Sequence, residues 1–223
     1  MDNQAIKNEF DVYLEGIGID LQDEQRVYVP VTADVAVQYG FQPPTDGIFI
    51  VHTNLNGSVM LGADGEPFVE LRHADGQLPA PGRRYSMRPG SGTHLFFPRR
   101  LKEFLDSTDF CLITEGAKKA SVVSCLGFPC IGLIGWSAWR TTGTDDLHYD
   151  FRQIQLENRN LFLIPDFDGA FNADIHREVQ KLALALHGAG AREVRLVKLP
   201  PVSGEKMGID DFLVMIREET ANV

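Results

Sequence analysis

The sequence contains few cysteines, and no two of them stand at the CxxC spacing. Only three occur among the 223 residues, Cys111, Cys125 and Cys130, and two of these lie in apolar runs. We therefore expect small buried thiols in a protein of a reducing compartment, the cytoplasm.

Long apolar runs are absent as well. No stretch approaches the roughly 20 consecutive apolar residues of a membrane-spanning helix, and the N-terminal residues MDNQAIKNEF are too polar for a signal peptide. There is also no internal repeat or low-complexity segment. Hydrophobic residues make up 43% and charged residues 23% of the chain, which excludes a disordered or fibrous protein. The length predicts one large or two small globular domains that do not contact a membrane.

Positive charge is scarce overall but concentrated in one segment. The chain has 21 Lys and Arg against 31 Asp and Glu, a formal net charge of −10. Residues 83–102, here called the basic strip, hold six basic residues and no acidic one, so the other 15 basic and 31 acidic residues give the remainder a net charge of −16. The six basic residues are Arg83, Arg84, Arg88, Arg99, Arg100 and Lys102.

The basic strip predicts a surface that binds single-stranded nucleic acid. Its basic side chains would pair with phosphates, while Tyr85, Phe96 and Phe97 would stack on bases. The alternative is a solvated hairpin whose aromatic side chains pack into the core, since the pattern around Leu95 also suits a plain strand.

Residues 1–105 are expected to form a smaller α+β region. Short β-like runs are separated by clusters of turn residues such as 42–47 (QPPTDG). Residues 32–39 predict a short helix with Thr32 as its N-cap and Gly40 as its C-cap. The β-like runs are 26–31, 48–52, 68–72 and 94–97.

Residues 106–223 are expected to form an α/β domain with a mainly parallel sheet of about four strands flanked by helices. A helix over 101–109 leads into this region, where apolar runs of strand length alternate with helical patterns. Such alternation predicts parallel pairing through right-handed crossovers, the Rossmann-like doubly wound arrangement. The predicted strands are 110–114, 129–134, 160–165 and 193–199, and the predicted helices are 118–126, 173–187 and 211–217.

Acidic residues directly follow two of the predicted strands. Glu115 comes after the run FCLIT, and Asp166 and Asp168 come after NLFLIP. Ligands of open α/β sheets bind beyond the carboxyl ends of the strands, and residues i and i+2 of an extended chain point the same way, so we expect these carboxylates to converge. Oxygen donors without a nearby set of His or Cys predict Mg²⁺, with Mn²⁺ as a substitute.

These residues also have purely structural interpretations. Glu115 could be favoured only by the dipole of the helix that follows it, and the two aspartates after the later strand could be turn residues. Asp210 and Asp211 could contact a metal or substrate, or could cap the final helix. Trp136 and Trp139, just past the second predicted strand, could lie near the same sheet edge or pack in the core.

Three segments resemble the Toprim superfamily. They are LITEGAKKA (112–120), LIPDFDGAFNADIHREVQKLA (163–183) and GEKMGIDDFL (204–213), which correspond in order to an EGxKKA-like motif, a DxD-like motif and a terminal K-x-G-x-D-D segment. This superfamily includes DnaG-type primases, topoisomerases, RecR proteins and OLD-family nucleases. The chain is most similar to the Toprim-like domains of phage, plasmid and other mobile-element primase and primase-helicase proteins, over roughly residues 65–215.

The resemblance implies roles for the acids and for nearby lysines. Glu115 would be the general acid or base at the transferred phosphate, and Asp166 and Asp168 would hold Mg²⁺. Lys118 and Lys119, on the first turns of the next helix, could contact phosphate or could simply be exposed on that helix. Lys206 has the same two interpretations.

The chain departs from DnaG-type primases in two places. Lys119 stands where those primases have an acid, and Gly169-Ala170 reverses their Ala-Gly pair. The N-terminal zinc-ribbon cysteines of many primases are also absent from this sequence.

Three functions agree with these features. The leading hypothesis is Mg²⁺-dependent primer synthesis from nucleotides on single-stranded DNA, in a mobile-element replication protein that could work with a replicative helicase. The second is a metal-dependent nuclease that uses the same acids. The third is a non-catalytic domain that binds nucleic acid, as DNA or an RNA/DNA hybrid, or a replication partner.

Overall fold

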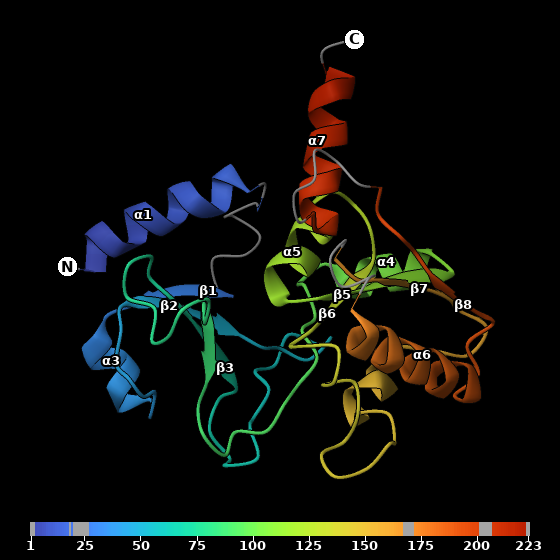
Figure 1. Cartoon of the computed structure of the whole chain (residues 1–223), viewed down its shortest axis with the longest axis horizontal. Coiled ribbons are helices and arrows are strands. Elements are labelled where there is room, and N and C mark those ends of the chain that lie inside the picture. Colours follow the sequence, from blue (N-terminus) through green and yellow to red (C-terminus); the bar gives the residue numbers. More distant parts are fainter. Residues whose placement is uncertain (1–2, 18, 20–26, 167–171, 201–206, 222–223) are drawn as a thin grey trace. The chain divides into compact units, whose positions relative to one another are not determined.

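The computed structural model describes residues 3–17, 19, 27–166, 172–200 and 207–221 (Figure 1). The chain divides into two compact units, Met1–Thr93 and His94–Val223, here called the N-terminal and C-terminal units. The amino-acid pattern predicts a boundary after residue 105 instead. Residues 94–105 lie in the C-terminal unit, where Phe96 exchanges two backbone hydrogen bonds of 2.8 and 3.0 Å with Gly132.

The N-terminal unit is built on an antiparallel sheet with strand order β1-β2-β3-β4. Its core is formed by apolar side chains of the first three strands and of the short helix α3, among them Ala36, Phe49 and Leu71. The N-cap Thr32 accepts a hydrogen bond from the backbone N–H of Val35, as the sequence predicts. Helix α1 and strand β4 were not predicted. The elements are α1 (Asn3–Gly16), β1 (Tyr28–Val31), α3 (Ala33–Gln38), β2 (Gly47–Val51), β3 (Val69–His73) and β4 (Tyr85–Met87).

A buried histidine joins two strands of this unit to a loop. The His73 ring lies 2.6 Å from Thr45 Oγ1 through Nδ1 and 2.7 Å from Ser86 Oγ through Nε2. Burial lowers the pKa of His73, and the positive charge of Arg83 lowers this pKa further. The ring is therefore neutral in the folded protein at neutral pH.

The C-terminal unit contains the predicted parallel sheet, with strand order β6-β5-β7-β8. Right-handed crossovers that lead in opposite directions from the centre of the sheet put α5 and α6 on opposite faces (Figure 1). The predicted apolar face of α6 is buried through Val179, Leu182 and Leu186. The elements are α4 (Leu101–Ser107), β5 (Phe110–Glu115), α5 (Ala117–Cys125), β6 (Cys130–Leu133), the 3₁₀ helix η1 (Tyr149–Gln153), β7 (Asn160–Ile164), α6 (Ala173–Gly188), β8 (Glu193–Leu196) and α7 (Ile209–Ala221).

A buried arginine closes the C-terminal end of α4. The Arg159 guanidinium donates to the backbone carbonyls of Leu105, Thr108 and Gln155 at 3.1, 2.8 and 2.9 Å. Carbonyls in the last turn of a helix have no partner within the helix, so a cation that binds them stabilises the helix end.

One sequence prediction about this region needs correction, and one element was missed. Residues 94–97 form an isolated bridge between Phe96 and Gly132 and not a strand. Helix η1 was not predicted, because a segment of five residues is too short to show a periodic pattern.

Within the part of the chain that the structure describes, no helix has the length and apolar character needed to cross a membrane.

Candidate functional site

Two of the three acids predicted at strand ends, Glu115 and Asp166, lie at the carboxyl ends of neighbouring strands of the parallel sheet. Strand β5 ends at Glu115, and Asp166 comes two residues after β7, whose Ile164 is paired with Thr114. Gly116 has a φ of 92°, a conformation that L side chains rarely adopt, and it turns the chain from β5 into α5. The two residues therefore stand at the ends of neighbouring strands, and the convergence of their carboxylates on a metal stays a prediction.

Lysines from the first turn of α5 contact acids on two other segments. Lys119 Nζ lies 2.9 Å from Asp166 Oδ2 and donates to the Glu115 carbonyl oxygen at 3.2 Å. Lys118 Nζ lies 2.9 Å from Asp210 Oδ2. The side chains of Lys118 and Lys119 are 25% and 19% exposed, so these lysines are not simple surface residues of the helix. They connect the ends of β5 and β7 with the start of α7.

The two aspartates at the start of α7 have different roles in the structure. Asp211 is exposed and accepts a hydrogen bond of 3.1 Å from the backbone N–H of Gly208, as the acid of a capping box does. Asp210 is 3% exposed and faces Lys118. The structural interpretation therefore holds for Asp211, whereas Asp210 belongs to the polar cluster at the sheet edge.

Gly208 provides the space for this cluster. A methyl group at residue 208 would lie 2.4 Å from Asp210 Oδ1 and 2.8 Å from Lys119 Cε, which is closer than Cβ atoms come to other atoms. Both atoms are near the ends of side chains, so a larger residue at this position would require Asp210 and Lys119 to shift.

The donors at this edge suit a hard divalent cation. Mg²⁺ prefers carboxylate oxygens, so Glu115 and Asp166 fit it by donor type. Asp210 Oδ1 is a further buried oxygen, and it meets no hydrogen-bond donor among the described residues. In the structure the Lys119 ammonium nevertheless contacts Asp166. The edge therefore combines oxygen donors for a metal with a lysine that neutralises one of them.

Two predicted site residues, Asp168 and Lys206, lie outside the described residues. Their predicted roles as metal and phosphate ligands stay predictions.

The basic strip is divided between the two units. In the N-terminal unit Arg83 and Arg84 are exposed, and Arg88 forms an ion pair of 2.7 Å with Asp64. This hydrogen-bonded ion pair lowers the pKa of the Asp64 carboxyl and raises that of the Arg88 guanidinium.

The C-terminal part of the strip is exposed but partly paired with acids of α4. Arg99 and Arg100 are exposed, and Arg100 lies 3.4 Å from Glu103. Lys102 lies 2.6 Å from Asp106 on the same helix. Solvent-exposed pairs of this kind contribute little to stability, so phosphate groups could replace the acids at low cost.

The aromatic residues of the strip do not form a stacking surface. Phe96 and Phe97 are each 1% exposed, so neither ring is accessible to a base, and the core interpretation is correct for both. Tyr85 is 39% exposed. Trp136 and Trp139 are buried as well, in agreement with their interpretation as core residues.

The cysteines are free thiols, and two of them are buried as expected. Burial raises the pKa of Cys111 to about 12 and raises that of Cys130 well above its usual value. Neither is a thiolate at neutral pH, so neither is a nucleophile.

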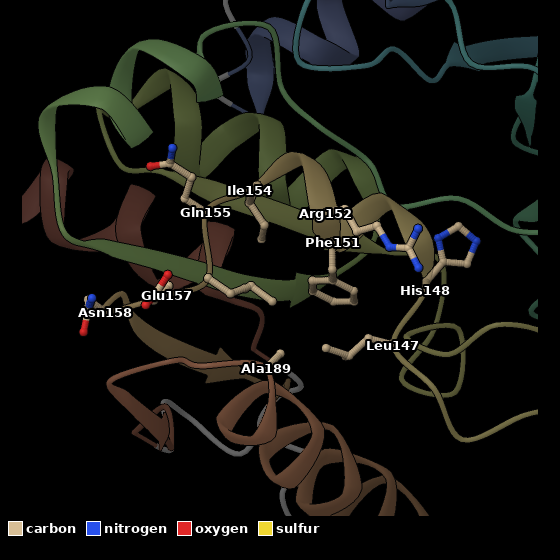
Figure 2. Close-up of a pocket in the computed structure, with 10 residues that line it drawn as sticks. Leu147, His148, Phe151, Arg152, Ile154, Gln155, Glu157, Asn158 and Ala189 are labelled. Atoms are coloured by element: carbon tan, nitrogen blue, oxygen red, sulfur yellow. The ribbon is translucent and has the colours of Figure 1, made fainter.

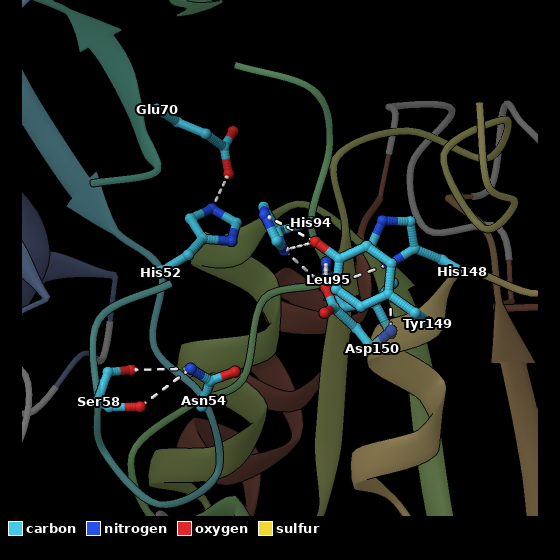
Figure 3. A network of polar contacts seen from close by, with 9 residues as sticks. All are labelled: His52, Asn54, Ser58, Glu70, His94, Leu95, His148, Tyr149 and Asp150. Carbon is cyan, nitrogen blue, oxygen red and sulfur yellow. Dashed lines mark hydrogen bonds and ion pairs between the residues drawn. The ribbon is translucent and has the colours of Figure 1, made fainter. Parts of the chain in front are cut away.

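A second polar cluster, which the sequence analysis missed, lies elsewhere in the C-terminal unit. It consists of His94, His148 and Asp150, all buried (Figure 3). Burial by itself would raise the pKa of Asp150, but hydrogen bonds from His148, His94 and the Leu95 N–H together hold it below its usual range. The only local signal is the spacing His-x-Asp at 148–150, since His94 is 56 residues from Asp150.

The fold of the chain is similar to that of DnaG primase catalytic cores. It aligns with the zinc-binding and RNA polymerase domains of the Aquifex aeolicus primase with a TM-score of 0.66 and 16% identity, over 96% of this chain and 54% of that chain. For the RNA polymerase domain of Mycobacterium tuberculosis primase DnaG the TM-score is 0.61 and the identity 11%, over 100% and 75%. For a DnaG primase catalytic domain bound to ssDNA the values are 0.57 and 16%, over 94% and 68%.

At these identities the likeness establishes the fold, which agrees with the fold implied by the Toprim resemblance. The chain spans about half the length of the Aquifex protein. No curated protein matches the chain.

A family model matches residues 103–220, which is more than half of the chain and contains the whole acid and lysine cluster. The chain is therefore a member of the family described as "Domain of unknown function (DUF3854)".

Proposed function

We propose that this chain is a primase-like nucleotidyl transfer domain that makes RNA primers on single-stranded DNA, in the replication protein of a mobile element such as a phage or plasmid. The observation that supports the proposal is that Glu115 and Asp166 lie at the carboxyl ends of neighbouring parallel strands, where Lys119 contacts the Asp166 carboxylate and the Glu115 backbone carbonyl. The similarity of the fold to DnaG primase cores, one of them bound to ssDNA, supports it.

In this proposal the acids have two tasks. Glu115 moves a proton to or from the reacting oxygen of the transferred nucleotide. Asp166 and Asp168 hold Mg²⁺, or Mn²⁺ as a substitute. When bound, this ion neutralises the charge that develops on the transferred phosphate and the leaving group.

In this proposal the lysines exchange a carboxylate partner for a phosphate group of the nucleotide. Lys119 is paired with Asp166 in the structure, and a nucleotide phosphate that enters the site would compete for its ammonium. Lys118 and Asp210 form a second pair of the same kind. This exchange would release Asp166 for the metal at the moment when the nucleotide is bound, and Lys206 would add a further positive charge.

The arginines and the lysine of the basic strip would bind the template backbone. Arg83, Arg84 and Arg88 would do so on the N-terminal unit, and Arg99, Arg100 and Lys102 on the C-terminal unit. Contacts to phosphate carry no sequence information, so we expect binding that depends on salt and not on base sequence.

The test is a primer-synthesis assay with single-stranded template, nucleotides and Mg²⁺. Glu115→Gln keeps the size of the side chain but removes its proton-transfer ability, and product should fall by about 10²- to 10⁴-fold. Glu193→Gln is the matched control, because Glu193 is the first residue of β8 and lies at the opposite edge of the sheet. Absence of product from wild type, or equal product from Glu115→Gln, would contradict the catalytic proposal.

A second candidate is a domain that binds single-stranded nucleic acid or a replication partner without catalysis. The specific observation in its favour is the Lys119–Asp166 ion pair, because the ammonium supplies positive charge where Mg²⁺ is expected. In that case Asp166→Asn would leave salt-sensitive binding of single strands intact, and the wild type would make no primer.

Lys119→Met separates the two candidates further. If Lys119 contacts the nucleotide, this substitution lowers primer synthesis. If Lys119 only replaces the metal, the substitution leaves Asp166 without its cation and increases Mg²⁺ binding, as measured by calorimetric titration.

A further inference from the structure

His94, His148 and Asp150 form a cluster of potential metal ligands that the proposed primase chemistry does not use. His94 precedes the backbone bridge between Phe96 and Gly132, and His148 is the N-cap of η1. Asp150 lies in the first turn of η1. The side chains of the two histidines and the aspartate are 5%, 4% and 1% exposed, so water does not solvate this group of polar atoms.

The ligand atoms lie close together around one carboxylate oxygen (Figure 3). His94 Nδ1 is 3.0 Å and His148 Nδ1 is 3.3 Å from Asp150 Oδ2. The Leu95 N–H donates to the same oxygen at 2.9 Å. One atom from each of the three side chains falls within 4.8 Å of the other two.

The hydrogen bonds of this cluster do not satisfy all of its atoms. Asp150 Oδ1 is buried and meets no donor among the described residues, which is costly for a carboxylate. His148 Nδ1 is 3.3 Å from both the Asp150 N–H, a donor, and Asp150 Oδ2, an acceptor. A single ring nitrogen cannot accept from one and donate to the other, so lone pairs outnumber protons at this point. A cation at this point would attract the lone pairs of Nδ1 and Oδ2, and the Asp150 N–H would give up its hydrogen bond to Nδ1.

We propose that His94, His148 and Asp150 bind a divalent transition-metal ion of the zinc class. Zinc lies about 2.0–2.1 Å from imidazole nitrogen and about 2.0–2.2 Å from carboxylate oxygen, so neighbouring ligands of a tetrahedral ion stand about 3.3–3.5 Å apart. The two nitrogen-to-oxygen distances, 3.0 and 3.3 Å, are close to this spacing. Two imidazoles with one carboxylate favour zinc or a similar ion over Mg²⁺.

The surroundings supply two further features of a metal site. The Tyr149 hydroxyl is 3.2 Å from His94 Nε2 and 3.3 Å from His94 Nδ1, so it contacts the ring of one proposed ligand and would accept the Nε2 N–H if Nδ1 binds the ion. His148 is also one of the residues that line a pocket of about 750 Å³ (Figure 2). The described residues provide no fourth His, Cys, Asp or Glu in this group, so water completes the coordination.

The ion would tie the segment that begins at His94 to helix η1. It is separate from the Mg²⁺ of the proposed primase chemistry in residues and in ligand type, so the two proposals can fail independently.

The experiment is metal binding by the untagged full chain. The protein is stripped with EDTA, incubated with Zn²⁺ or with Mg²⁺, desalted and analysed by mass spectrometry for retained metal. We expect about one zinc per chain, no retained magnesium, and a melting temperature that rises with Zn²⁺ but not with Mg²⁺. His148→Ala and Asp150→Asn should abolish zinc retention, whereas the control His187→Ala, at an exposed position in α6, should not.

Two measurements keep the proposal testable if the ligand variants do not fold. Tyr149→Phe retains all three ligands, so it should still bind zinc with about tenfold lower affinity. Co²⁺ added to the stripped wild type should give the visible absorption of a centre with nitrogen and oxygen ligands.

Three results would overturn the proposal. They are no zinc retained by folded wild type, equal retention by folded His148→Ala or Asp150→Asn, and a Co²⁺ spectrum with the charge-transfer bands of cysteine ligation.

Discussion

Replacing Gly132 by alanine tests whether the parallel sheet holds Glu115 in a fixed position. Gly132 lies in β6 next to the turn that follows β5. A methyl group on this residue would be 2.8 Å from the Gly116 carbonyl oxygen, 3.1 Å from its carbonyl carbon and 3.3 Å from Phe96 Cβ. The first two are backbone atoms, which cannot rotate away as a side chain can. The Gly116 peptide, directly bonded to Glu115, would have to move.

The size of the effect follows from this overlap. The backbone must separate by about half an ångström to reach ordinary contact, and forcing a methyl group into a packed interior costs about 1–3 kcal/mol. In a protein of this length each kcal/mol lowers the melting temperature by about 2–4 °C, so we expect a decrease of about 2–12 °C. Primer synthesis should fall about tenfold or more, because a displacement of about 1 Å at a catalytic group costs about 10²-fold.

Thermal unfolding and primer synthesis are measured on Gly132→Ala and on a control, Gly135→Ala. A methyl group at residue 135 meets no atom within 4 Å, and this glycine does not have a left-handed φ, so the control should resemble wild type. Melting temperatures of the two variants within about 1 °C of each other would show that the Gly116 backbone moves at little cost in free energy. That result would refute the prediction.

Three other predictions follow from the described contacts. The folded pKa of His73 lies below the unfolded value of about 6.5, so the contribution of His73 to stability is complete above that pH and is lost as the pH falls through the folded pKa. The unfolding free energy of wild type should therefore decrease between about pH 7 and 5 more steeply than that of His73→Gln. Equal slopes would contradict the burial argument. Arg159→Lys removes the planar guanidinium, which donates to three backbone carbonyls. The unfolding free energy measured by urea titration should fall by about 2–3 kcal/mol. A decrease below about 0.5 kcal/mol would show that lysine stabilises the helix end equally well. Arg99→Ala combined with Arg100→Ala should weaken single-stranded DNA binding and flatten its dependence on salt, and an unchanged salt slope would separate this part of the basic strip from binding.

Local patterns in the sequence predicted the architecture of the C-terminal unit. Short apolar runs that alternate with helical patterns indicated a parallel sheet, and the positions of Glu115 and Asp166 directly after two runs predicted acids at one sheet edge. The prediction succeeded because strand formation and crossover handedness depend on residues close together in the chain.

Burial and side-chain pairing could not be predicted in the same way. The strip around Phe96 has the composition of a nucleic-acid surface, yet Phe96 and Phe97 pack inside the C-terminal unit. The pattern of a strand specifies which side chains share a face, but it does not specify which face is covered.

The charges at the two polar clusters were decided by tertiary structure alone. Lys119 reaches Asp166 across 47 residues, and His94 reaches Asp150 across 56. By itself, the sequence determined the order of strands and helices and the placement of acids at strand ends. Only the folded chain decided which cation or donor each acid faces, because electrostatic and metal-ligand contacts depend on distances of a few ångströms that sequence separation does not encode.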